Sequence, residues 1–391
     1  MTAAKVLLPG EATLGVMGGG QLGRMFVHAA QSQGYRTVVL DLDPQSPAGL
    51  VAHEHIRADY LDETGLDQLA ARCDAITTEF ENVPAQALER LAATRFVAPA
   101  GAAVAICQDR AAEKAHFRAS GVACAPYAVI ESEADLPTVP EGLLPGILKT
   151  ARMGYDGKGQ QRVKTRAELA AAWAALKGVP CVLEQMLPLQ LELSVIVARG
   201  ADGQLVQFPL QQNLHRDGIL AVTQVPAPDV SESMQAEASA SVARIAASMN
   251  YVGVLCVEFF VLQDGRLVVN EMAPRPHNSG HYTIDACDLS QFDLQVRSMA
   301  GLPLRTPRLH SATVMLNLLG DLWFDGEAST AQRTPAWDQV LALPGTHLHL
   351  YGKTEARRGR KMGHLNITAA TPAEAAALAA QAAAILGLPA F

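Results

Sequence analysis

Two glutamates that face each other across a predicted hairpin are the clearest chemical feature of this 391-residue sequence. The stretch Val254–Ala273 is predicted as two strands flanking Asp264-Gly265, a dipeptide typical of a two-residue turn. With that turn, Glu258 falls directly opposite Glu271, and the Cβ atoms of such a pair lie about 4.5–5.5 Å apart. The neighbouring residues are mostly apolar, so solvent screens the two like charges only in part.

The repulsion between these two carboxylates requires a compensating charge. A proton shared between them would raise one pKa, and nearby arginines would also neutralise the pair. A divalent cation does so at neutral pH, and hard oxygen ligands suit Mg2+. The sequence therefore predicts that Glu258 and Glu271 hold magnesium, with a shared proton or arginines as alternatives. Arg275, just past the second strand, is placed to neutralise a phosphate oxygen beside the metal.

A glycine-rich segment between the predicted strands Ile147–Thr150 and Gln161–Lys164 supplies further candidates. A hairpin of this kind folds over phosphates and donates backbone N–H groups, while Lys149 on the preceding strand adds a positive charge. It is not a Walker A loop, because the sequence contains no G-x-x-x-x-G-K-[ST]. An ordinary flexible hairpin is the alternative. The loop residues are Gly154, Tyr155, Asp156, Gly157, Lys158, Gly159 and Gln160.

An earlier glycine loop, Gly18-x-Gly20-x-x-Gly23, matches the dinucleotide-binding fingerprint. It follows the predicted strand Thr13–Met17 and opens a helix, and Asp41 and Asp43 come about twenty residues later. An NAD-dependent oxidoreductase is one interpretation, but nothing downstream supplies a hydride-transfer site. The loop therefore predicts an anion site, or only a tight strand-to-helix turn.

The elements that would position these residues change in type along the chain. Up to about residue 105, short strands alternate with helices, which favours right-handed βαβ units and a parallel sheet. Beyond it, runs of strands beside helices favour α+β domains. The carboxy-terminal part holds the predicted strands Thr313–Leu318 and Thr346–Leu350, a basic loop at Lys353–Lys361 and an Ala-rich helix at Pro372–Leu386.

The composition excludes several classes of protein. A formal net charge of −8 argues against a large nucleic-acid surface, although a local basic cluster can still hold a small anion. No run approaches the roughly 18 apolar residues of a membrane span, and no secretory leader is evident. The six cysteines are scattered and form no C-x-x-C. We expect a cytoplasmic protein with neither nucleic-acid nor membrane partners.

Several of these motifs together resemble the nucleotide site of the ATP-grasp superfamily. The residues that carry this resemblance are Lys149, Gly154–Gln160, Glu184-Gln185, Glu192, Glu258 and Asn270-Glu271. More narrowly, the chain resembles the N5-carboxyaminoimidazole ribonucleotide synthetase family almost end to end. The matching segments are Gly18–Arg24, Glu79–Pro84, Gln108–Arg110, Gly154–Gln160, Asn213–Gly218, Asn270–His281 and Gly359–Asn366.

The resemblance implies a mixed α/β and α+β architecture built on an ATP-grasp fold. A Rossmann-like pre-ATP-grasp domain would cover residues 1–107, and a small β-rich domain that packs on the core would cover 306–391. The ATP-grasp domain would span 108–305, with a lid-containing subdomain at 108–187 and a metal-binding subdomain at 188–305. A homodimer is also implied.

The resemblance also implies the ATP site, with magnesium as the cofactor. Glu184 to Leu187 would form the adenine segment, Glu192 would accept from the ribose hydroxyls, and His215 would lie near the nucleotide. Without the resemblance, Glu184 and Glu192 would be interpreted as a solvated strand face. The implied ATP-binding residues are Arg110, Lys149, Gly154, Tyr155, Asp156, Gly157, Lys158, Gly159, Gln160, Glu184, Gln185, Met186, Leu187, Glu192, His215, Asn270 and Glu271.

The family's second substrate is 5-aminoimidazole ribonucleotide, whose phosphate needs an anion site. The basic loop offers three charges for it, and the Gly18–Gly23 turn would supply amides from the other side. Arg357 and Arg358 are expected to be solvated surface. The implied substrate-binding residues are Gly20, Gln21, Leu22, Glu81, Tyr155, Asn278, Lys353, Arg360 and Lys361.

His277 and His281 have the i, i+4 spacing of a helical zinc pair. Pro276 precedes them and Asn278-Ser279-Gly280 breaks a helix, so we expect a substrate-lining loop instead.

The reaction implied is that of a carbon–nitrogen ligase of purine biosynthesis. ATP would phosphorylate bicarbonate, and the carboxyphosphate, or CO2 released from it, would be attacked by the exocyclic amine of the imidazole. Lys149 and Arg275 would stabilise the transferring phosphoryl group, and Asp156 would orient the amine or accept its proton. A non-enzymatic nucleotide-binding regulator and an NAD-dependent oxidoreductase are the rival hypotheses.

Overall fold

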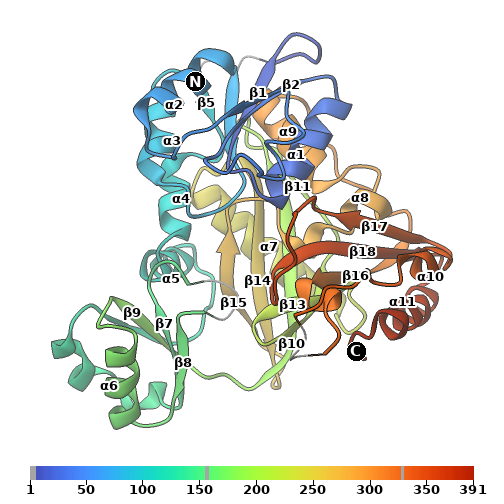
Figure 1. Cartoon of the computed structure of the whole chain (residues 1–391). Coiled ribbons are helices and arrows are strands. Elements are labelled where there is room, and N and C mark those ends of the chain that lie inside the picture. The colour runs from blue at the N-terminus through green and yellow to red at the C-terminus, as the bar shows by residue number, and fades with distance from the viewer. Residues whose placement is uncertain (1–5, 155–157, 327–329) are drawn as a thin grey trace.

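The computed structural model describes residues 6–154, 158–326 and 330–391 (Figure 1). The first layered unit is a five-stranded parallel sheet in the order β3-β2-β1-β4-β5. The parallel sheet predicted for the first hundred residues is therefore confirmed. Its elements are β1 (Thr13–Met17), α1 (Gln21–Ser32), β2 (Arg36–Leu40), β3 (Glu54–Ile56), α2 (Glu63–Arg72), β4 (Ala75–Thr78), α3 (Ala85–Ala92), β5 (Phe96–Val97) and α4 (Gly101–Cys107).

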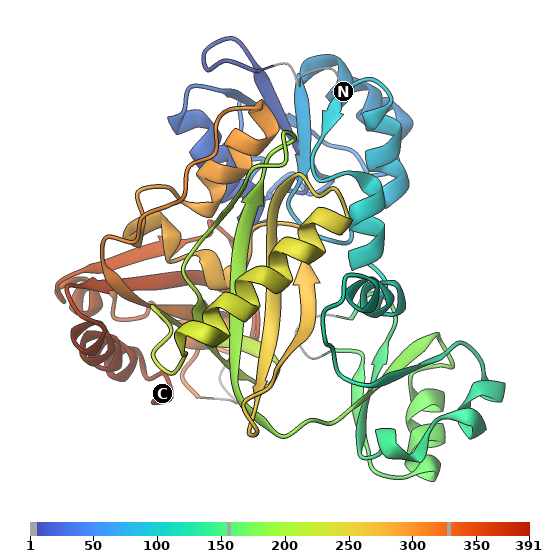
Figure 2. The same cartoon turned by 180° about the vertical axis from the view of Figure 1, so that it is seen from behind.

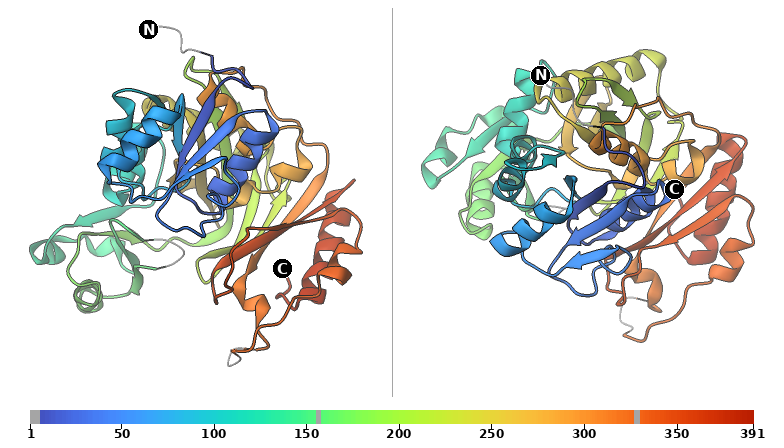
Figure 3. Two further views of the ribbon diagram at one scale, coloured as in Figure 1. Left: turned by 45° about the horizontal axis from the view of Figure 1, so that its top comes forward. Right: turned by 90° about the horizontal axis from the view of Figure 1, so that it is seen from above.

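A small four-stranded antiparallel sheet follows, in the order β6-β9-β7-β8. In Figure 3 it lies on the opposite side of the molecule from the carboxy-terminal strands. Its elements are α5 (Arg110–Ala119), β6 (Tyr127–Ile130), the 3-10 helices η1 (Glu133–Thr138) and η2 (Glu141–Leu143), β7 (Gly146–Thr150), β8 (Gln160–Val163), α6 (Arg166–Ala175) and β9 (Cys181–Gln185).

The central sheet has nine strands in the order β15-β14-β10-β12-β13-β16-β18-β17, with β11 paired to β10. Because β16 pairs with β13, the carboxy-terminal strands continue this sheet across the proposed boundary at residue 305. The elements are β10 (Leu189–Arg199), β11 (Leu205–Gln207), β12 (Gln211–Arg216), β13 (Ile219–Val225), α7 (Glu232–Ser248), β14 (Gly253–Leu262), β15 (Leu267–Ala273), η3 (Asn278–Gly280), α8 (Thr283–Ala286), α9 (Gln291–Ala300), β16 (Ala312–Leu319), η4 (Gly320–Trp323), α10 (Trp337–Leu341), β17 (Thr346–Leu350), β18 (Lys361–Ala369) and α11 (Pro372–Leu386).

Helix α7 covers one face of the part of this sheet that carries the carboxylates (Figure 2). Strand side chains alternate between faces, so Val257 and Phe259 of β14 pack with Val242 and Ile245 of α7. Glu258 points to the opposite face, where Val254 and Cys256 of the same strand pack in a cluster with Leu294 of α9. The alternation therefore separates Glu258 from the face that α7 covers.

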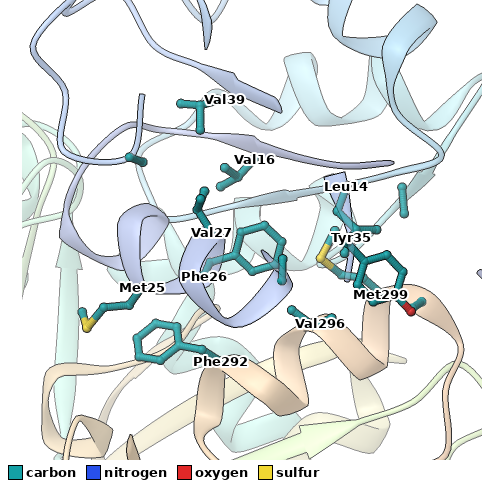
Figure 4. Packing of buried hydrophobic residues seen from close by; sticks show 14 of the residues in the cluster. Leu14, Val16, Met25, Phe26, Val27, Tyr35, Val39, Phe292, Val296 and Met299 are labelled. Carbon is teal, nitrogen blue, oxygen red and sulfur yellow. The ribbon is translucent and has the colours of Figure 1, made fainter. Parts of the chain in front are cut away.

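Helix α9 joins the parallel sheet to the central one. Its residues Phe292, Val296 and Met299 pack with Phe26 of α1 and Leu14 of β1 in one buried cluster (Figure 4). This contact fixes the first glycine loop, which precedes α1, relative to the strands that carry the carboxylates. Among the described helices, none combines the length and apolar character needed to cross a bilayer.

Candidate active site

The predicted opposition of the two carboxylates is confirmed, since Glu258 of β14 pairs with Glu271 of β15. The predicted two-residue turn is wrong. Leu262 and Arg266 close the hairpin, and Gly265 adopts a left-handed φ of 84°, so the loop has one more residue than expected. A bulge between Glu258 and Phe259 restores the predicted register, because Phe259 pairs with Val269 and Asn270 is skipped.

Each carboxylate of the pair has its own neighbouring side chain. Glu258 Oε1 lies 3.0 Å from His277 Nε2, and Glu271 Oε2 accepts a hydrogen bond of 3.1 Å from Arg110 Nη1. Burial acts to raise the pKa of Glu258, but the charges of His277, His215 and Arg275 outweigh it and hold that pKa at about 2. The arginine alternative is thus realised for Glu271.

Helix α5 clamps the strand on both sides of Glu271, through two residues that the sequence analysis did not single out. Lys114 Nζ donates to the Asn270 carbonyl at 2.7 Å, and Glu113 Oε1 accepts from the Met272 N–H at 2.7 Å. Both side chains are fully buried. The only sequence signal was their position one turn beyond Arg110, which places all three on neighbouring faces of one helix.

Lys149 and Glu184 meet on the small sheet, where β7 and β9 are neighbours. Lys149 Nζ donates to Glu184 Oε2 at 3.1 Å, and Lys114 Nζ lies 3.4 Å from the same oxygen. Burial would raise the pKa of Glu184, but the two lysines outweigh it and lower that pKa. Glu184 is buried, so the alternative of a solvated strand face does not hold for this residue.

Glu192 and His215 are in contact on β10 and β12. Ser194 of β10 pairs with Glu258, so their side chains lie on the same face of the sheet. Glu192 is two residues before Ser194 on the same strand and therefore also lies on the face of Glu258. Burial acts to lower the pKa of His215, but the bond to Glu192 and the charges of Glu258 and Glu271 raise it to about 9. His215 is therefore a cation at neutral pH, close to the carboxylate pair.

The segment Gln185–Leu187 links the small sheet to the central one. The Gln185 N–H donates to the carbonyl of Pro126, just before β6, and the Met186 N–H donates to the carbonyl of Pro145, just before β7. Met186 is exposed. An adenine-binding role for this linker stays a prediction, consistent with its position between the two sheets.

The second glycine loop connects β7 and β8, as predicted. Gly159 has a φ of 72°, and a Cβ there would lie 2.7 Å from Thr150 Oγ1, so this position requires glycine. At the other end, a Cβ on Gly154 would lie 3.6 Å from an Arg110 guanidinium nitrogen, so the loop approaches the carboxylate cluster. Tyr155, Asp156 and Gly157 lie outside the described residues.

The first glycine loop already has acceptors within the chain. Gly20 and Gly23 donate their N–H groups to Glu79 at 2.9 and 3.0 Å, and Gly19 donates to Asp41 at 2.7 Å. Burial raises the pKa of Glu79 despite these two bonds. A phosphate at this turn would therefore have to use the N–H groups of the first helical residues, Gln21 and Leu22.

The basic loop reaches this turn across the molecule. Lys353 Nζ donates to Gln21 Oε1 at 2.7 Å and to the Lys361 carbonyl at 2.6 Å. Arg360 Nη1 donates to a backbone carbonyl of the same loop at 2.8 Å. Arg357 is exposed and pairs with Glu355, as expected of a solvated residue. The structure thus brings Lys353 to the first glycine loop.

Glu81 and Arg275 form an ion pair beside the carboxylate hairpin. Asn278, in the loop that follows, is buried, and neither polar atom of its side chain has a hydrogen-bond partner among the described residues. An amide held without partners is suited to a ligand that supplies both a donor and an acceptor.

His277 and His281 point to different surroundings. His277 faces Glu258, whereas His281 is fully buried 4.7 Å, ring to ring, from His364. The pair therefore does not form the i, i+4 zinc site, as expected.

The sheets and the site define a class of protein. A model of the ATP-grasp domain matches residues 115–292, one of the ribonucleotide synthetase preATP-grasp domain matches 11–108, and one of the phosphoribosylaminoimidazole carboxylase C-terminal domain matches 313–378. The chain is an ATP-grasp protein with a preATP-grasp domain ahead of it, and the predicted fold class is confirmed.

Its relatives narrow the class to one family. The N5-carboxyaminoimidazole ribonucleotide synthase of Brucella melitensis is 45% identical over 362 residues, 92% of this chain and 96% of that protein. A crystal structure of the Staphylococcus aureus synthetase complexed with ADP has a TM-score of 0.88 at 39% identity and covers 98% of both chains. An Aspergillus clavatus structure in complex with ADP and 5-aminoimidazole ribonucleotide has a TM-score of 0.87 at 32% identity, covering 97% of this chain and 99% of that one. The chain belongs to the N5-carboxyaminoimidazole ribonucleotide synthase family and is a ligase of the ATP-grasp type.

Proposed function

We propose that this chain carries out the reaction of its family, the ATP-dependent carboxylation of 5-aminoimidazole ribonucleotide with bicarbonate in purine biosynthesis. The observation that carries the proposal is one cluster of side chains from separate elements. Arg110 of α5, Lys149 of β7, Glu192 of β10, Glu258 of β14 and Glu271 of β15 converge there through the ion pairs and strand pairings described above. A cluster of alternating charges at the meeting of two sheets suits a nucleotide triphosphate.

ATP would lie between the small sheet and the central sheet. Arg110 and Lys149 are the cations placed to bind phosphate oxygens, and the Gly154–Gln160 loop would cover them. Glu192 would accept from the ribose hydroxyls beside His215, and the linker from Glu184 to Leu187 would bind adenine. Lys149 is deeply buried and its pKa is lowered by burial, so an anionic ligand that favours its charged form would bind strongly there.

Magnesium fits the carboxylate hairpin. Glu258 and Glu271 offer hard oxygen ligands on one face, and the side-chain Oδ1 of Asn270, buried in the bulge, has no hydrogen-bond partner among the described residues. When bound, the ion neutralises charge on the phosphate oxygens of ATP. His277 and Arg110, which hold the two carboxylates in the structure, would then be released toward the substrates.

The phosphate of the imidazole ribonucleotide would lie between the basic loop and the first glycine loop. Lys353, Arg360 and Lys361 would supply charge there, and Gln21 and Leu22 would supply N–H groups from the start of α1. Asn278, with both polar atoms unpaired among the described residues, would bind the imidazole portion near Glu81.

The chemistry follows from these positions. A bicarbonate oxygen attacks the γ-phosphorus, the bond to the β-phosphate oxygen breaks, and ADP leaves with its electron pair. The exocyclic amine then attacks the carbonyl carbon of carboxyphosphate, phosphate leaves, and the amine loses a proton. Lys149 and Arg275 stabilise the phosphoryl charge, and closing the glycine loop excludes the water that would hydrolyse carboxyphosphate. Asp156, which lies outside the described residues, is proposed to accept the proton or orient the amine.

The test is a turnover assay with protein, Mg-ATP, bicarbonate and 5-aminoimidazole ribonucleotide, in which ADP is followed with and without the imidazole. We expect ADP release to depend on the imidazole. ADP release that ignores it would reject the proposed substrate but leave ATP binding in place. A melting temperature raised by NADH and not by ATP would favour the oxidoreductase instead.

A homodimer and a cytoplasmic location are also proposed from the family resemblance. Sedimentation of the full chain tests whether it forms a homodimer.

A further inference from the structure

Cys256, Glu258 and His277 form a cluster of three metal-ligating side chains that the proposed reaction does not use as a set. One ligand atom from each, a thiol sulfur, a carboxylate oxygen and an imidazole nitrogen, lies within 4.8 Å of the other two. Ligand atoms bind zinc at about 2.0–2.3 Å. Small side-chain rotations would therefore bring all three into one coordination sphere.

The strand pattern explains why the thiol lies there. Cys256 precedes Glu258 by two residues on β14, so both side chains project from the face opposite α7. The cross-strand partner of Cys256 is Ala273, whose side chain is a single methyl group. Cys256 is fully buried, whereas 13% of the Glu258 side chain and 15% of the His277 side chain are exposed. An ion would thus enter past Glu258 and His277 and meet the thiol beneath them.

The hydrogen bonds of His277 fix the direction in which its ring points. His277 Nδ1 accepts from the Ser279 N–H at 3.3 Å and lies 2.9 Å from Ser279 Oγ, while Nε2 faces Glu258 at 3.0 Å. A metal at Nε2 would move the ring proton to Nδ1, where Ser279 Oγ can accept it, the usual arrangement of a metal-binding histidine. Ser279 Oγ also accepts from Ser194 Oγ at 2.8 Å, so the orienting hydroxyl is itself held.

We propose that Cys256, Glu258 and His277 bind a divalent transition metal of the zinc class, with a fourth coordination position open to solvent. Sulfur and imidazole ligands suit zinc and cobalt, whereas magnesium requires hard oxygen ligands. On binding, the S–H bond breaks, a metal–sulfur bond forms and the proton leaves to solvent. The thiolate and the carboxylate together then balance the two positive charges of the ion.

This site has a consequence for the carboxylate hairpin. Glu258 belongs both to the proposed magnesium pair with Glu271 and to the zinc-class set with Cys256. A zinc-class ion would therefore inhibit ATP turnover by withdrawing Glu258. This inhibition rests on the proposed function, but binding of the ion does not.

Cobalt(II) titration of the full chain without magnesium tests binding directly. We expect the near-ultraviolet charge-transfer band of a cobalt–thiolate bond, abolished in Cys256→Ala and bleached when zinc is added. Cys287→Ala is the matched control, because Cys287 is also buried but lies outside the cluster, and it should keep the band. His277→Asn should weaken cobalt binding by at least about tenfold. No band in the wild type, or an equal band in Cys256→Ala, would overturn the proposal.

Circular dichroism and thermal melting check that Cys256→Ala folds. If it does not, Cys256→Val replaces it, because valine fills the space of the thiol without a ligand atom. For inhibition, ADP release is measured at fixed magnesium and rising zinc, relative to each protein's own uninhibited rate. Half-inhibition should need at least about tenfold more zinc in the Cys256 variant than in the wild type. Equal zinc inhibition of the wild type and the Cys256 variant would reject the inhibitory role. Absence of turnover in both proteins would count against the proposed function, while the cobalt band would still test the metal site.

Discussion

Glu258 and Glu271 lie opposite each other across β14 and β15, yet each carboxylate contacts a different side chain. Glu258 contacts His277, from the loop after β15, and Glu271 contacts Arg110, from α5. The two carboxylates are thus held from two different elements. A metal ion bound by both carboxylates would replace both contacts. Its binding would therefore change the surroundings of α5 and of the loop after β15 together.

Removal of one of these carboxylates should stop the reaction without unfolding the chain. We expect Glu271→Gln to lower ATP turnover by at least about 100-fold, the scale on which a lost electrostatic contact to the transition state acts. Its side chain is 42% exposed, so the melting temperature should change little. Glu54→Gln is the control, since Glu54 is 43% exposed and lies far away on β3. Near-normal turnover in Glu271→Gln would reject the metal role.

The clamp from α5 should matter for both stability and nucleotide binding. Lys114→Met leaves the buried Asn270 carbonyl without its donor, which costs about 1–3 kcal/mol in the free energy of unfolding. Because the bulge beside Glu271 loses its support, KM for Mg-ATP should also rise. Urea denaturation and initial rates measure the two effects. Lys164→Met, at an exposed position, should change neither, and unchanged stability in Lys114→Met would contradict the clamp.

The basic loop should act on one substrate only. Lys353→Met should raise KM for 5-aminoimidazole ribonucleotide about tenfold, the effect of losing a hydrogen bond to a charged group worth about 1.5 kcal/mol. KM for ATP should stay unchanged, because Lys353 lies beside Gln21 and away from β7 and β9. Arg357→Met, in the same loop but paired with Glu355 at the surface, is the control. Equal increases in both KM values would point to a general structural defect.

Two neighbouring buried histidines should make the fold sensitive to acid. His281 and His364 are fully buried, and burial, followed by neighbouring positive charges, holds their pKa values well below the usual range. Below about pH 6.5 the unfolded chain binds protons that the folded chain excludes, so stability is lost as the pH falls. The limiting slope is about 1.4 kcal/mol per pH unit for each histidine.

Urea unfolding between about pH 5.5 and pH 7.5, one unit either side of the unfolded histidine pKa, measures this slope. His364→Phe should flatten it, since the ring is kept without a titrating group. His310→Phe, at an exposed position, should leave it unchanged. Equal slopes in the wild type and in His364→Phe would show that the ring of His364 charges as easily in the fold as outside it.

The sequence predicts the elements with the strongest local patterns correctly. The strands Thr13–Met17 and Thr346–Leu350 and the helix Pro372–Leu386 have the predicted bounds. The residues within each of these segments favour one type of element, so the local sequence is enough to predict it.

The carboxylate hairpin shows where local reasoning ends. The opposition of Glu258 and Glu271 was predicted from a turn that is one residue too short, and the bulge at Asn270 cancels that error. Nothing near Asn270 in the sequence signals the bulge, because the group that holds its carbonyl is Lys114, more than 150 residues earlier. Likewise, the first glycine loop signalled a turn, but not that Glu79 and Asp41 would occupy its amides.

The clamp on β15 also has a consequence for the solution behaviour of the chain. β15 is the last strand of the central sheet, and such a strand presents a row of unpaired backbone groups to any other extended chain. Lys114 and Glu113 occupy two of these groups, and the Val269 N–H donates to the Ala123 carbonyl at 2.8 Å. The contacts that hold Glu271 in place therefore also protect an open sheet edge from aggregation.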